Sequence, residues 1–90
     1  MHEHLEKQID KAVSTLTQGL VRICSENPAR PLSFSASFVF YQLGINPIIA
    51  ADHICRIVQR AVDAFNKMDS PDYATYQIEE PDVEITISAR

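Results

Sequence analysis

The chain has 90 residues, of which 46% are hydrophobic, and a formal net charge of -4. This length predicts a single domain, residues 1–90, with a core small enough that self-association would help to stabilise it. The mild acidity and the lack of a lysine or arginine cluster argue against nucleic-acid binding, and no apolar run is long enough to span a membrane. Because the first residues lack an apolar signal segment, we expect a cytoplasmic protein.

The first predicted element is an amphipathic helix over residues 3–26. Its hydrophobic residues recur at spacings of three and four, the period of a helix with one buried face. Gly19 falls beside this apolar stripe, where a missing side chain lets another segment come close. Pro28 and Pro31 end the helix and make a stiff connection. The stripe consists of Leu5, Ile9, Ala12, Val13, Leu16, Leu20 and Ile23.

The segment that follows, PLSFSASFVFYQL from Pro31 to Leu43, supports two interpretations. Over residues 32–41 one set of alternate positions is entirely apolar, which is the pattern of a strand with one buried face. This set is Leu32, Phe34, Ala36, Phe38 and Phe40, and it alternates with Ser33, Ser35, Ser37, Val39 and Tyr41. The same segment can be interpreted as a helix by family resemblance. We favour the strand, because a C-terminal hairpin needs a third strand to be stable in water.

A second amphipathic helix is predicted for residues 46–68. Asn46 is a favourable N-cap and Pro47 suits the first helical position, so the start of the helix is well marked. Asp69, Ser70 and Pro71 end it. The two cysteines, Cys24 and Cys55, lie on the two predicted helices among apolar neighbours, and we expect them to be small buried residues and not a disulfide or a metal pair.

The C-terminal residues predict a β-hairpin. Apolar and polar residues alternate over residues 74–78 and again over residues 83–89, and Glu79 to Asp82 form the turn between them. In the register that this turn favours, all the apolar residues fall on one face of the hairpin. The predicted cross-strand pairs are Ile78 with Val83, Tyr76 with Ile85, and Ala74 with Ile87.

These elements in order give an α+β fold with the arrangement α-β-α-β-β. Residues 32–41 supply the third strand of an antiparallel sheet, and the two amphipathic helices cover its apolar face. Local pattern and overall arrangement agree in this fold, as expected of a foldable sequence.

A set of small, apolar and proline residues between Ala12 and Leu43 resembles the Dpy-30 motif, a relative of the dimerisation/docking fold of regulatory subunits. The resemblance needs no gap and covers about a third of the chain. The residues that carry it are Leu16, Gln18, Gly19, Leu20, Glu26, Pro28, Pro31, Leu32, Phe34, Ala36, Ser37 and Phe38.

This resemblance implies an alternative fold, an all-α helical dimer with a C-terminal hairpin, in which residues 32–43 are helical. In that family two helices from each subunit form a four-helix bundle, and the dimer groove holds an amphipathic helix from a partner. Leu16, Leu20, Phe34 and Phe38 would then form the docking core.

The residue types that support catalysis or metal binding lie in unfavourable arrangements. His2 and His4 are two apart on a terminal helix and point to different sides. Asp52, His53 and Cys55 are also too close in sequence to face one another on a helix. The acidic residues from Glu79 to Glu84 suit a solvated turn. We therefore expect no catalytic residue, metal or cofactor.

The outward face of the predicted sheet is the best candidate for a partner surface, because it combines small hydroxyl residues with tyrosines. We expect a small non-enzymatic protein that acts by protein–protein contact or oligomerisation, with a homodimer favoured. Two alternatives stay open: a Dpy-30-like docking module that binds an amphipathic helix, and a small-ligand binder or enzyme that uses His53. The candidate surface consists of Ser33, Ser35, Ser37, Val39, Tyr41, Tyr73 and Thr75.

Overall fold

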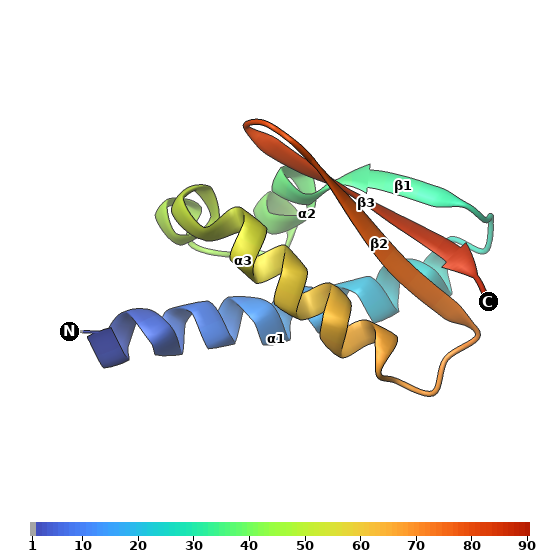
Figure 1. Ribbon diagram of the computed structural model, residues 1–90, viewed down its shortest axis with the longest axis horizontal. Helices are drawn as coiled ribbons and strands as arrows, with labels where there is room; N and C mark the ends of the chain where they lie inside the picture. The colour runs from blue at the N-terminus through green and yellow to red at the C-terminus, as the bar shows by residue number, and fades with distance from the viewer. Residues whose placement is uncertain (1) are drawn as a thin grey trace.

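The protein is described by a computed structural model that covers residues 2–90, with side chains from His4 onward. It confirms the α+β class and the three-stranded antiparallel sheet (Figure 1). One short helix is present in addition to the predicted elements. In chain order the elements are α1 (His2–Glu26), β1 (Leu32–Ser35), α2 (Ala36–Gln42), α3 (Pro47–Asn66), β2 (Asp72–Glu79) and β3 (Asp82–Ala89).

The sheet has the strand order β1-β3-β2, so the last strand in the chain lies in the middle. The predicted hairpin register is confirmed, since Ile78 lies opposite Val83, Tyr76 opposite Ile85 and Ala74 opposite Ile87. β1 pairs with the other side of β3, and its first residue, Leu32, also lies opposite Ile87. The alternation of the central strand places Val83, Ile85 and Ile87 on the buried face.

The segment from Pro31 to Leu43, for which the sequence supports two interpretations, changes from strand to helix at Ser35. Residues 32–35 form the predicted strand, but the prediction of a strand as far as residue 41 is wrong, because α2 begins at Ala36. Ser35 has an extended backbone, and its hydroxyl accepts a hydrogen bond from the N–H of Phe38, so it is the N-cap of the new helix. After this cap the side chains follow a helical period and no longer alternate across a sheet.

Three helices pack beside the sheet. α3 contacts β2 and β3, and α2 contacts β1 and β3. α1 packs against α3, which crosses it in Figure 1. The core lies between these layers. Its largest fully buried side chains are Phe40, Phe65, Ile9, Leu16, Leu20, Ile57, Ile85, Ile87, Val58 and Val83.

Two local signals in the sequence have the expected structural role. The side chain of Asn46 accepts hydrogen bonds from the N–H groups of Ile48 and Ile49, which caps α3. A Cβ atom on Gly19 would lie 2.7 Å from a methyl carbon of Leu43, so the missing side chain lets the end of α2 approach α1 closely. α3 is kinked at His53, whose backbone has non-helical dihedral angles.

Candidate functional site

The carboxylate of Asp82, at the start of β3, joins the hairpin to the N-terminus of α2. One of its oxygens accepts hydrogen bonds from the Ser37 N–H at 3.1 Å, the Ser37 hydroxyl at 2.9 Å and the Val83 N–H at 2.7 Å. The other oxygen accepts a hydrogen bond from the Ser35 hydroxyl. Asp82 therefore supports the point at which β1 ends and α2 begins.

These hydrogen bonds decide the charge state of the cluster. Partial burial by itself would raise the pKa of Asp82, but the bonds from Ser35, from the Val83 and Ser37 backbone and from the Ser37 hydroxyl outweigh it and hold the pKa below its usual value. An ionised carboxylate that is saturated with donors caps a helix well. Among the described side chains no histidine bonds to Ser35 or Ser37, so neither serine is paired with the usual base of a nucleophilic hydroxyl.

The structure separates the residues of the predicted partner surface into two groups. Ser33, Tyr73 and Thr75 lie on the outward face of the sheet, as predicted. The hydroxyls of Ser33 and Thr86 are 2.8 Å apart, and Thr75 lies opposite Thr86 on its other side, so these three form a row across the strands.

The remaining members of that predicted surface belong to the strand–helix junction and to α2. Ser35 and Ser37 are bonded to Asp82, and Val39 is buried in the core with 3% of its surface exposed. Tyr41 is 85% exposed, but on α2 and not on the sheet. The prediction of one continuous face is therefore wrong, because the helical period begins after Ser35.

The exposed Tyr41 of α2 lines a groove of about 600 Å³, called here the α2–α3 groove. Phe38 is 59% exposed and lies one helical turn from Tyr41, so both present large apolar surfaces on the same side of α2. Ile48, at the start of α3, is 70% exposed. The groove is lined chiefly by Phe40 and Tyr41 of α2, Pro47, Ala51 and Ile54 of α3, and Pro81 of the hairpin turn.

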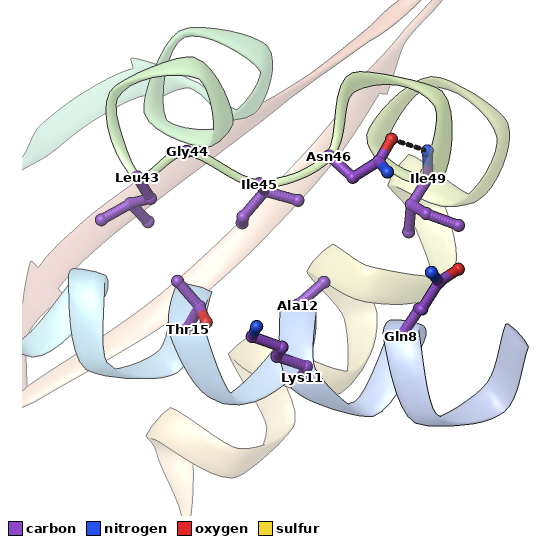
Figure 2. Close-up of a pocket in the computed structure, with 9 residues that line it drawn as sticks. All are labelled: Gln8, Lys11, Ala12, Thr15, Leu43, Gly44, Ile45, Asn46 and Ile49. Carbon is purple, nitrogen blue, oxygen red and sulfur yellow. Dashed lines mark hydrogen bonds between the residues drawn. The ribbon is translucent and has the colours of Figure 1, made fainter. Parts of the chain in front are cut away.

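A second hollow, of about 440 Å³, lies between α1 and the connection from α2 to α3 (Figure 2). Leu43, Ile45 and Ile49 point toward α1 on one side, and Lys11 is the charged residue on the other. The Asn46 amide oxygen at its rim is already bonded within α3. A single exposed cation without a second charged group does not define a ligand, so this hollow supports no particular chemistry.

The four residues that the Dpy-30 resemblance places in a docking core lie in different environments. Leu16 and Leu20 of α1 are fully buried within the core of this single chain. Phe34 of β1 is half-buried opposite Ile85, and Phe38 is exposed on α2.

The residues singled out for chemistry remain dispersed. His53 lies at the kink of α3, and the side chain of His2 is outside the described part of the molecule. Burial, and then the nearby charge of Asp72, raises the pKa of the Cys24 thiol, which makes it a poor nucleophile. Both cysteines are free. From His4 onward the structure contains no group of histidine, cysteine and carboxylate side chains suited to a metal ion.

Three polar residues with clear structural roles escaped the sequence analysis. Asp82 caps α2, the guanidinium of Arg30 binds both carboxylate oxygens of Asp72, and the Asn66 amide bonds to the backbone of Ala74. The partners of Arg30 and Asp82 are more than forty positions away in the chain. No local pattern reveals such pairs, and the only signal was an unexplained polar residue beside an element boundary.

Comparison of the chain with protein-family models, with curated proteins and with solved structures gave no match. In the part of the chain that the structure describes, no helix is long and apolar enough to cross a membrane. The geometry of the residues is therefore the basis for a functional assignment.

Proposed function

We propose that this protein acts by protein–protein contact, and that the α2–α3 groove is its principal binding surface. The observation that supports this is an apolar groove with the exposed Tyr41 in its lining, on a helix that also exposes Phe38. Large aromatic side chains in water lose little conformational freedom on binding and bury much apolar area, so they are enriched in interfaces. A cytoplasmic location and self-association are part of the same proposal.

The lining of the groove favours binding over catalysis. Its hydroxyl groups come from Ser37, which is already bonded to Asp82, and from the exposed Tyr41. An amphipathic partner helix matches such a surface, since it can place an apolar stripe along the groove. The Dpy-30-like docking module and the ligand binder that uses His53 stay predictions.

Paired capture experiments test the proposal. The variant Phe38→Ser/Tyr41→Ser removes Tyr41 from the lining of the groove together with the exposed Phe38 one turn away on α2, while Tyr73→Ser removes an exposed tyrosine from the outward face of the sheet. We expect a specific partner to be retained by the wild-type chain and by Tyr73→Ser, and to be lost by the double variant, with all three chains folded by circular dichroism. Equal retention by all three would contradict a role for the groove.

A further inference from the structure

The free edge of β2 is closed at one position by a side chain of α3. The N–H of Ala74 donates to the Asn66 amide oxygen at 2.7 Å, and the Asn66 amide nitrogen donates to the Ala74 carbonyl at 2.9 Å. Asn66 thus occupies both backbone groups of Ala74 in the way that a neighbouring strand would. These bonds also show that the N–H and C=O groups of Ala74 point away from β3.

Backbone direction alternates along a strand, so Tyr76 and Ile78 point their N–H and C=O groups toward the same free edge. Asp72 obeys the same rule, since its N–H bonds to Ser70 and its carbonyl to Arg90. Within the described residues no such bond is formed by the outward groups of Tyr76 and Ile78. The half of the edge at Tyr76 and Ile78 is therefore open, while the half at Asp72 and Ala74 is occupied.

The open half has none of the usual protection of an edge strand. β2 has the sequence DYATYQIE, which contains neither lysine nor proline, and it pairs residue for residue with β3 without a bulge. The side chains of Tyr76 and Ile78 are 37% and 52% exposed although they lie on the same face as the buried Ala74. Both the backbone and the side chains of this half are thus suited to pairing with another strand.

We propose that β2 pairs with β2 of a second copy of this chain, antiparallel and across a two-fold axis at Gln77, to form one continuous six-stranded sheet. Tyr76 of each copy lies opposite Ile78 of the other, and the outward N–H and C=O groups of both residues are satisfied. The two apolar side chains then cover one another on the helix-bearing face. This interface is separate from the α2–α3 groove and does not depend on it.

Asn66 selects this register over its neighbours. A shift that places Tyr76 opposite Tyr76, or opposite Ala74, needs the backbone groups of Ala74, which Asn66 already holds. A shift that places Ile78 opposite Ile78 leaves Tyr76 unpaired. Among two-fold registers, the one centred on Gln77 uses all the free groups and none of the occupied ones.

The antiparallel register also keeps the two acidic turns apart. The turn of each hairpin carries Glu79 and Glu80, and the proposed register brings it to the Ala74 end of β2 in the other copy. The open hollow of about 700 Å³ beside Tyr76 is lined there by Arg56 and Arg60, which are paired with Glu6 and Asp10 of α1, and by Asp63. The two turns therefore lie at opposite ends of the paired strands, whereas two acidic turns side by side would repel each other.

Single cysteines test the register directly. At the two-fold axis the Cα atoms of the two Gln77 residues would be about 4.5 Å apart, within the range of a disulfide. We expect Gln77→Cys to give a covalent dimer under mild oxidation. Thr75→Cys, on the same face, would be about 13 Å from its counterpart and should stay uncrosslinked, as should the wild-type chain with its native cysteines. Efficient cross-linking of Thr75→Cys in place of Gln77→Cys would overturn the register.

Sedimentation of the full chain tests the interface without a covalent bond. We expect a dimer whose dissociation constant rises about tenfold or more in Ile78→Lys, because a charge then replaces an apolar side chain in two symmetric contacts. Phe38→Ser/Tyr41→Ser should dimerise as the wild type does, which separates this interface from the groove. A wild-type monomer at high concentration, or a dimer lost in the groove variant and kept in Ile78→Lys, would overturn the proposal.

Discussion

The Ser35 hydroxyl donates a hydrogen bond to the carboxylate of Asp82, so the start of the last strand holds the residue at which the first strand becomes a helix. The two residues are 47 positions apart in the chain. The same carboxylate also binds the backbone N–H and the hydroxyl of Ser37. A single side chain thus connects the sheet to α2, and its removal should loosen both.

Replacement of Asp82 by alanine should lower the free energy of unfolding by about 1–2 kcal/mol, the usual cost of losing a helix cap with its bonded partners. Urea unfolding followed by circular dichroism measures this loss. Glu80→Ala changes an exposed acidic residue of the neighbouring turn and should have an effect of less than about 0.5 kcal/mol. Equal midpoints for the two variants would show that Asp82 does not support the strand–helix junction.

Stability should fall in acid. The Arg30 hydrogen bond holds the pKa of Asp72 below its usual value, and the pKa of Asp82 is also lowered. A carboxylate with a lowered pKa in the folded state stabilises the fold fully above its unfolded pKa of about 3.9, and this contribution is lost as the pH falls through the folded pKa. Urea midpoints measured from pH 6 downward should therefore decrease below about pH 4.

A variant assigns this acid dependence to its source. Asp82→Asn cannot lose a charge, so its midpoint should start lower and decline less steeply than that of the wild type as the pH falls. A slope identical to that of the wild type would mean that Asp82 does not contribute, and would leave Asp72 as the source of the dependence.

The close approach of Gly19 and Leu43 predicts a coupled pair. Alanine in place of an exposed helical glycine gains about 1 kcal/mol, but here the new Cβ would lie 2.7 Å from a Leu43 methyl carbon. Gly19→Ala alone should therefore gain less than this, because Leu43 has to move. In a Leu43→Ala background the same substitution should recover the full gain. A double-mutant cycle measures the difference, and additive effects would argue against the contact.

Loss of the Asn66 amide should have two effects. Asn66→Ala leaves the outward N–H and C=O of Ala74 without their partners, which should cost about 1–2 kcal/mol of stability. It also frees Ala74 for intermolecular pairing, so a register centred on Tyr76, with Ala74 opposite Ile78 of the other copy, becomes available, and the Gln77→Cys cross-link of the native background should weaken. Asn66→Asp, which keeps the acceptor for the Ala74 N–H, should lose less stability. An unchanged cross-linking pattern would show that Asn66 does not select the register.

The hairpin could be predicted from sequence because its information is local. Alternation in two adjacent strands and a short turn determine the register, and the pairs of Ala74, Tyr76 and Ile78 follow from it. The helices could also be predicted, since Asn46 and Pro47 mark the start of α3 and the apolar spacing marks its buried face.

The end of β1 could not be predicted in the same way. The alternation continues to Tyr41, but the chain leaves the sheet at Ser35, whose hydroxyl is held by Asp82 from a distant segment. The candidate surface was affected by the same error: Ser33 and Thr75 face outward as predicted, whereas Val39 is buried. The closure of the β2 edge by Asn66 could not be predicted either, because Asn66 lies on α3, eight positions before Ala74, and is not part of the alternation of the strand.

The position of β3 between β1 and β2 has a consequence for biosynthesis. Leu32 and Ala74 both lie opposite Ile87, so neither outer strand has its partner until residues 82–89 have left the ribosome. A nascent chain that ends before Asp82 has helices but no sheet, and β1 waits for about fifty residues of translation. A truncation within β3 should therefore remove the sheet as a whole, and expose the apolar sides of all three helices to the protein quality-control machinery.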